Sequence, residues 1–201
     1  EAIHLQADIL DIKANSNRAA RGVIIESKLE KGRGSVATVL VQKGTLNVSD
    51  IFISGSEWGK VKAIINDRGK NLQNAEPAQP IEVLGFDSNP LAGDDFIVVD
   101  NESTARKIAE YRKSKLQIQK NTVVKTNVEE MFAQINKGEA TSLPVVIKTD
   151  VQGSAEAIEN SITKLSTDEV KVNVIYKGVG AITESDVALA GSGKGFIVGF
   201  N

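Results

Sequence analysis

The chain has 201 residues, 41% of them hydrophobic and 25% charged, which suffices for one large or two small domains with a real core. Its 24 Lys and Arg nearly balance 26 Asp and Glu, which excludes a uniformly basic nucleic-acid coat but not a local basic stripe. Cysteine is absent and His4 is the only histidine, so neither a thiolate or histidine metal site nor a Ser-His-Asp triad is expected. No apolar run is long enough to span a membrane.

The charge is unevenly distributed along the sequence. Residues 1–100 carry 11 basic and 14 acidic groups, residues 101–125 carry 7 and 2, and residues 126–201 carry 6 and 10. A basic connector therefore separates two mildly acidic blocks. Because the first residue is Glu and the only Met is Met131, we expect the sequence to be part of a longer protein. The charged, periodic start does not resemble a cleavable signal.

Residues 1–100 show short β-branched runs separated by glycine-containing turns, a pattern typical of strands. The predicted strands are residues 22–27, 35–42, 50–54, 59–64, 80–84 and 95–99. Closure of a sheet removes its exposed edges, so this spacing predicts a small antiparallel β-barrel over residues 1–100.

Residues 101–127 are predicted to form a basic helical linker. Asn101 or Ser103 is a suitable N-cap, and apolar residues from Ala105 to Leu116 recur at helical spacing. Basic residues occupy much of the remaining surface. Two interpretations stay open, a lever-like basic helix and a solvated linker whose charges serve solubility.

Residues 128–201 alternate between helix and strand patterns and predict an α/β domain. A short helix is expected over residues 128–135, and strands over 143–148, 170–175 and 196–200. One further helix opens near Gly153-Ser154, and another is introduced by a capping box at Thr183 and Asp186. Buried strands alternating with helices indicate an α/β/α arrangement around a small parallel sheet.

The glycine-rich segments do not fit the known phosphate-binding loops. Gly55 to Lys60 has the wrong spacing for a P-loop, and Gly191 to Gly195 precedes a strand instead of a helix. Residues 32–37 match the Gly-x-Gly-x-x-Ala pattern of a dinucleotide-binding loop, but the β-branched residues that follow predict a strand where that loop requires a helix. We therefore expect no catalytic, cofactor-binding or metal-binding residues in this sequence.

Gly153 and Ser154 mark a turn between a parallel strand and a helix. The simplest interpretation is a turn in which one of them is the N-cap of the helix. For the backbone we expect a positive φ at Gly153, or another chain packed against its α-carbon, instead of an ordinary N-cap with extended dihedrals. The alternative is an anion site at the helix N-terminus, which Asp150 and Glu156 would oppose.

A basic cluster surrounds an expected hairpin loop at residues 28–34. Arg or Lys in such a loop could contact phosphates, and charges that serve solubility alone explain the pattern equally well. Aromatic residues are only 4% of the chain and are not interleaved with the cluster, so stacking on bases is not expected.

Two motif sets resemble the bacterial translation initiation factor two family. Residues 21–46, with the core Gly-Arg-Gly-x-Val-Ala-Thr, are similar to its second domain, whose barrel is shared by translational GTPases. Residues 147–157 and 179–187, and the ending Gly199-Phe200-Asn201, resemble its third domain. One departure is Ser49, which stands where the family usually has Gly.

The resemblance implies a non-catalytic, monomeric and cytoplasmic middle segment of the factor. It would contact the small ribosomal subunit and its RNA, and relay nucleotide state from a GTPase domain to an initiator-tRNA-binding domain, both outside this sequence. GTP and magnesium would bind in the GTPase domain. It also favours RNA contact by the basic residues, which we expect at Arg21, Lys28, Lys31, Arg33, Arg106 and Arg112. The rival hypothesis is a stand-alone α/β protein that binds a phosphorylated ligand.

Overall fold

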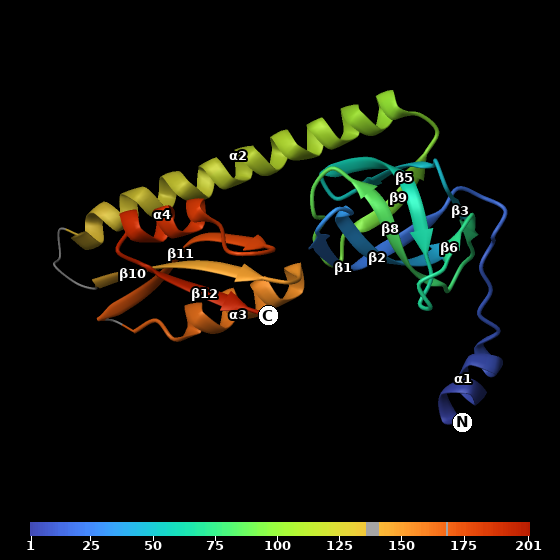
Figure 1. Cartoon of the computed structure of the whole chain (residues 1–201), viewed down its shortest axis with the longest axis horizontal. Coiled ribbons are helices and arrows are strands. Elements are labelled where there is room, and N and C mark those ends of the chain that lie inside the picture. The colour runs from blue at the N-terminus through green and yellow to red at the C-terminus, as the bar shows by residue number, and fades with distance from the viewer. Residues whose placement is uncertain (136–140, 168) are drawn as a thin grey trace.

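The computed structural model describes residues 1–135, 141–167 and 169–201, with side chains described outside 119–135 and 141. It contains a β-barrel and an α/β domain, and the long helix α2 (Glu102–Ile135) runs from one to the other (Figure 1). A short helix, α1 (Ala2–Leu10), precedes the barrel and buries none of its residues. The barrel strands therefore occupy a narrower range than the predicted residues 1–100.

Six strands form the closed barrel: β1 (Arg21–Glu30), β2 (Gly34–Lys43), β4 (Ile51–Ser54), β5 (Glu57–Ile65), β8 (Pro80–Phe86) and β9 (Asp95–Val99). Their order is β4-β9-β1-β2-β8-β5, and the antiparallel pairing of β4 with β5 closes the ring. Each of the six predicted strands is confirmed. The two-residue strands β3 (Leu46–Asn47), β6 (Asn71–Leu72) and β7 (Asn74–Ala75) were not predicted.

The barrel is filled by one continuous apolar core. Phe52 lies at its centre, with its ring centroid 4.6 Å from those of both Phe86 and Phe96. Aliphatic side chains that alternate along the strands, such as Val39 and Val41 of β2, complete the core. The alternation places these residues on the inner face of the sheet because successive side chains point to opposite faces.

Helix α2 begins against the barrel. Asn101 caps it, since its Oδ1 accepts a hydrogen bond from the Thr104 amide at 2.8 Å, as one of the two predicted caps requires. Ala105 and Ala109 are buried one turn apart and face the barrel side of the helix. The helix continues without a break to Ile135, so the predicted boundary between residues 127 and 128 falls inside it.

The α/β domain contains a parallel three-stranded sheet in the order β11-β10-β12, as predicted. Its elements are β10 (Thr141–Thr149), α3 (Gln152–Lys164), β11 (Val170–Val179), α4 (Glu184–Ser192) and β12 (Phe196–Phe200). Figure 1 shows α3 and α4 on opposite sides of the sheet. Val145, Ile147 and Ala155 form the small core beneath α3.

The end of the barrel that carries the β1–β2 hairpin touches the α/β domain. Lys28 of β1 forms an antiparallel bridge with Val151, immediately before α3. A methyl group placed on Gly180, after β11, would lie 3.5 Å from Cδ2 of Leu29. The two domains thus meet directly at the hairpin as well as through α2. Among the residues described, no helix is both long and apolar enough to cross a bilayer.

Candidate nucleic-acid interface

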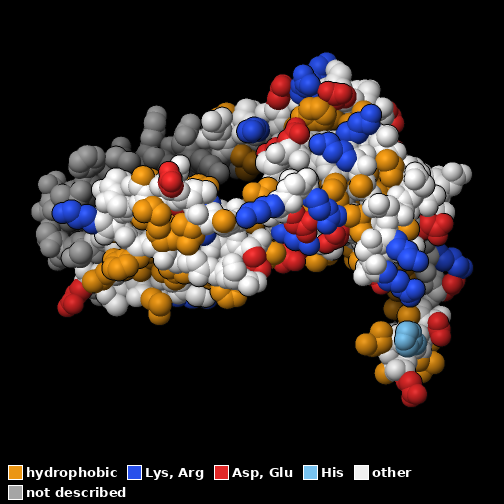
Figure 2. Space-filling view, in the orientation of Figure 1, with side chains coloured by type: hydrophobic (Ala, Val, Ile, Leu, Met, Phe, Trp, Pro, Cys, Tyr) orange, Lys and Arg blue, Asp and Glu red, His pale blue; other side chains and the backbone are white. Residues whose placement is uncertain are grey.

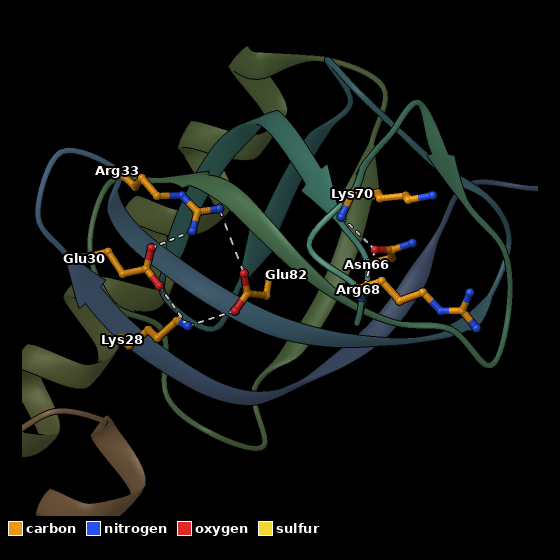
Figure 3. Close-up of polar contacts among 7 residues, drawn as sticks. All are labelled: Lys28, Glu30, Arg33, Asn66, Arg68, Lys70 and Glu82. Carbon is orange, nitrogen blue, oxygen red and sulfur yellow. Dashed lines mark hydrogen bonds and ion pairs between the residues drawn. The ribbon is translucent and has the colours of Figure 1, made fainter.

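The β1–β2 hairpin carries a compact network of four charges. Lys28 Nζ lies 2.8 Å from Glu30 Oε1 and 2.8 Å from Glu82 Oε1, while Arg33 Nη1 lies 2.7 Å from Glu30 Oε2 (Figure 3). Arg33 Nη2 also lies 4.0 Å from Glu82 Oε2. Two cations therefore face two carboxylates, and the group is neutral as a whole.

The hydrogen bonds within this network favour the charged forms of Lys28 and Glu30. The bond from Lys28 lowers the pKa of Glu30 below its ordinary value, and partial burial opposes this effect. The bonds to Glu30 and then Glu82 raise the pKa of Lys28. The predicted exposed loop at residues 28–34 is thus a hairpin, but Lys28 and Arg33 already have anionic partners within the barrel.

Three other predicted contact residues also have partners. Arg21 lies 3.4 Å from Asp95, and Arg112 donates a hydrogen bond of 2.8 Å to the Gly55 carbonyl. Arg106 pairs with Glu102 at 3.1 Å, and its guanidinium lies 5.3 Å from the centroid of the Trp58 ring.

Lys31, at the tip of the hairpin, is exposed and forms no ion pair with the described residues. RNA contact by the six predicted residues stays a prediction, and Lys31 is the member whose side chain forms neither an ion pair nor a hydrogen bond with the described residues.

A second cationic loop was not selected from the sequence. Arg68 and Lys70 lie between β5 and β6, and their side chains extend to the same side in the view of Figure 3. Both are exposed and have no ion pair with any described residue. The signal was present as Asn-Asp-Arg-Gly-Lys, a turn sequence directly after the β-branched run that ends at Ile65.

The prediction of a positive φ at Gly153 is wrong. Gly153 is the second residue of α3, does not have a positive φ, and a Cβ placed on it would meet no atom within 4 Å. The chain turns earlier, at Val151, whose φ of −133° and ψ of 155° are extended. Glycine is therefore not required by the backbone at this position.

The expected N-cap is also wrong, because Val151 occupies that position without a side-chain hydrogen bond. Neither Gly153 nor Ser154 caps α3. Thr149 Oγ1 instead donates to the Val151 carbonyl at 2.7 Å, which helps to hold the turn. Gly153 thus leaves an open, sterically permissive surface at the start of α3.

The other helix start in the α/β domain follows the sequence closely. Thr183 and Asp186 form the predicted capping box of α4. Asp186 is buried and also lies 3.1 Å from Nζ of Lys148, itself only 7% exposed and 5.3 Å from the centroid of the Tyr176 ring. The hydrogen bond from the Thr183 amide is the main cause that lowers the pKa of Asp186, with Lys148 adding to it.

The described residues contain no group of three or more His, Asp or Glu side chains placed to hold a metal ion. Gly34 opens strand β2, and Gly191 to Gly195 precede strand β12, as expected from the sequence. Neither segment precedes a helix, so neither offers amide groups at a helix N-terminus to a phosphate.

Two family models match successive parts of the chain. A family model described as translation-initiation factor 2 matches residues 99–201, and one described as elongation factor G domain 2 matches residues 19–99. The second match confirms the expected barrel type.

Full-length relatives match over the whole chain. Translation initiation factor IF-2 of Rhodospirillum rubrum is 56% identical over 202 residues, which cover 100% of this chain and 23% of that protein. IF-2 of Caldicellulosiruptor saccharolyticus is 51% identical over 201 residues, with the same two coverages. A crystal structure of GDP-bound aIF5B from Aeropyrum pernix aligns with 98% of this chain and 37% of its own, at 17% identity and a TM-score of 0.47. The chain thus spans about a quarter of the length of these curated relatives.

Proposed function

The chain belongs to the translation-initiation factor 2 family, and on that premise we propose that it is the non-catalytic segment of the factor that binds the small ribosomal subunit and relays nucleotide state. In this proposal the barrel rests on ribosomal RNA. The α/β domain passes the state of a GTPase domain to an initiator-tRNA-binding domain, both outside these 201 residues. The segment acts in the cytoplasm as a monomer.

The observation that carries the relay proposal is the double connection between the two domains. Helix α2 joins them covalently, and the Lys28–Val151 bridge joins them a second time at the hairpin. A body held at two points transmits a displacement of one part to the other more faithfully than a body held by one flexible linker. This arrangement favours the lever-like interpretation of α2 over the solvated linker.

The relay is tested by weakening the second connection within the full-length factor. Leu29→Ala removes the side chain that approaches Gly180, and Leu29 is 53% exposed, so the barrel should keep its stability. Leu91→Ala is the matched control, because Leu91 is 49% exposed and lies on another barrel loop. We expect Leu29→Ala alone to reduce the GTP dependence of initiator-tRNA binding. Equal behaviour of the two variants would contradict the relay through the hairpin.

We also propose that nucleotide chemistry lies outside this segment, so that GTP and magnesium bind elsewhere in the factor. The absence of a Gly-x-x-x-x-Gly-Lys-Ser/Thr sequence supports this. Calorimetric titration of the chain with GTP and magnesium should show no micromolar binding. Such binding would instead favour the rival hypothesis of a phosphate-ligand protein.

A further inference from the structure

Strand β5 and the loop after it carry an exposed row of cations. Between residues 60 and 70 the basic residues are Lys60, Lys62, Arg68 and Lys70, all of them exposed, and Asp67 is the single acid. Lys60 and Lys62 flank the buried Val61, so the alternation of the strand points both away from the core. The barrel therefore presents excess positive charge along one strand and its turn.

The loop that ends this row is held in a fixed shape by Asn66. Its Oδ1 accepts hydrogen bonds from the amides of Arg68 at 3.0 Å and Lys70 at 2.9 Å. The backbone N–H of Asn66 donates to the Lys70 carbonyl at 3.0 Å, and the backbone carbonyl of Asn66 accepts from the Gly69 N–H at 3.0 Å. The backbone under the two cations is thus ordered without any bond from their charged groups.

The two cation pairs drawn in Figure 3 differ in what they face. Lys28 and Arg33 are matched by Glu30 and Glu82, so an anion that binds them must compete with two carboxylates. Arg68 and Lys70 form no ion pair with the described residues, and their backbone is already ordered. Binding of an anion there breaks no ion pair and costs little backbone entropy.

We propose that Arg68 and Lys70 bind backbone phosphates of the small-subunit RNA, a proposal that rests on the proposed function. An Arg guanidinium binds phosphate in a bidentate manner, and a Lys ammonium adds a point charge. Residues 66–70 contain no aromatic side chain, so the loop is suited to phosphates and not to stacking on bases. Lys60 and Lys62 extend the same cationic surface along β5.

The test compares two charge-matched double variants of the 201-residue chain. Arg68→Ala with Lys70→Ala removes the proposed contact, and Lys107→Ala with Lys113→Ala removes two exposed cations of α2. Affinity for small ribosomal subunits is measured from about 50 to about 200 mM salt, where each lost phosphate contact lowers the salt slope by about 0.7–0.9. Over this range the unaltered chain should lose about 7- to 12-fold more affinity than the loop variant.

Each outcome decides a different point. Loss of affinity and slope in the loop variant alone supports the proposal, and equal behaviour of the two variants overturns it. Absence of binding by the unaltered chain overturns the proposed function as well. If the loop variant loses affinity for subunits but not for refolded, protein-free small-subunit RNA, the partner is an acidic ribosomal protein and the RNA contact is refuted.

Asn66→Ala separates the fixed shape of the loop from its charge. It removes the acceptor for two amides and leaves Arg68 and Lys70 in place. We expect weaker binding at every salt concentration, with a slope closer to that of the unaltered chain than to that of the loop variant. Unchanged affinity would overturn the argument that the site is ordered in advance.

Discussion

The barrel buries its phenylalanines, whereas the α/β domain exposes its own. Phe52, Phe86 and Phe96 meet in the barrel core, while Phe196 and Phe200 of β12 are 61% and 53% exposed. The barrel is closed on itself and has one large apolar core. The α/β domain has a three-stranded open sheet, a small core, and a lysine and an aspartate buried together.

This difference separates two ways of holding a small domain together. Closure gives each of the six barrel strands a hydrogen-bonded neighbour on both sides, so no strand edge is left unpaired and apolar packing dominates the stability of the barrel. The α/β domain depends more on specific polar contacts at its loops, and a buried ion pair adds stability only while both partners remain. Substitutions should therefore act differently in the two regions.

The largest effect is expected for Phe52→Ala, which empties the centre of the barrel. Replacing a buried phenylalanine by alanine lowers the free energy of unfolding by about 3–5 kcal/mol, because the removed atoms no longer contribute buried apolar surface and a cavity remains. Phe196→Ala, at an exposed position, should stay within about 0.5 kcal/mol. Denaturant unfolding followed by Trp58 fluorescence measures the first, and circular dichroism compares both. Comparable losses in the two variants would remove the contrast between the domains.

A backbone substitution in the barrel should follow. Gly85 of β8 has a φ of +123°, and a Cβ there would lie 1.9 Å from the Lys60 carbonyl oxygen. Gly85→Ala is thus strained by both conformation and contact, and we expect a cost on the order of 1–3 kcal/mol. Thermal melting measures it. A melting temperature equal to that of the unaltered chain would show that β5 and β8 can separate at little cost.

The contribution of the buried Lys148–Asp186 ion pair to the stability of the α/β domain is tested by Lys148→Met, with Lys177→Met as the control. Lys148 is buried against Asp186, while Lys177 pairs with Glu159 at the surface, where such pairs contribute about 0–1 kcal/mol. We expect the Lys148 variant to lower the melting temperature of this domain more than the control, and to leave the barrel transition unchanged. Equal shifts in the two variants would assign no special role to the buried pair.

Because Asp186 is ionisable, the stability that this ion pair contributes depends on pH. Its folded-state pKa is lowered, so its contribution is present above the unfolded pKa, near 3.8, and is lost as pH falls through the lower folded pKa. Asp186→Asn should therefore destabilise the chain at about pH 7, and the difference should shrink as pH falls below 3.8 towards the lower folded-state pKa. Melting curves across this pH range measure this. A difference between the two proteins that grows on acidification would reverse the assigned sign.

The smallest effect is expected at Gly153, and it has the opposite direction. Because Gly153 lies in the first turn of α3 with open space beside it, Gly153→Ala should stabilise the chain by up to about 1 kcal/mol. Thermal melting measures this beside Gly85→Ala, the matched substitution in the barrel. Destabilisation by Gly153→Ala would restore the structural requirement that was first expected there.

The six long strands could be predicted because each carries its own alternation or β-branched run. Strands β3, β6 and β7 have two residues each, too few for any period to be visible. Ser49 has a φ of 76°, in the left-handed region that favours glycine, and glycine is the residue that the family resemblance implies at this position. Gly153 misled the prediction because glycine is compatible with a positive φ but does not require one.

The candidate site was less predictable, because the partners of its charges are distant in sequence. Lys28 and Glu82 are brought together by the pairing of β1 and β8 with β2, and no local pattern reveals that contact. The cations are therefore visible in the sequence, but the carboxylates that neutralise them are not. The loop at residues 66–70 has a low net charge, since Asp67 offsets one of its cations, and only the structure shows that Arg68 and Lys70 form no ion pair with the described residues.

Closure of the ring has a consequence for the order in which the chain folds. Strand β9 pairs with both β1 and β4, and the contact of Val23 with Asp95 spans about 70 residues. During synthesis the barrel must wait for its last strand, while α2 forms from contacts within a few residues. We expect refolding in which amides of α2 are protected early and those of β1 late. Pulsed hydrogen exchange would reveal this sequence, and simultaneous protection would contradict it.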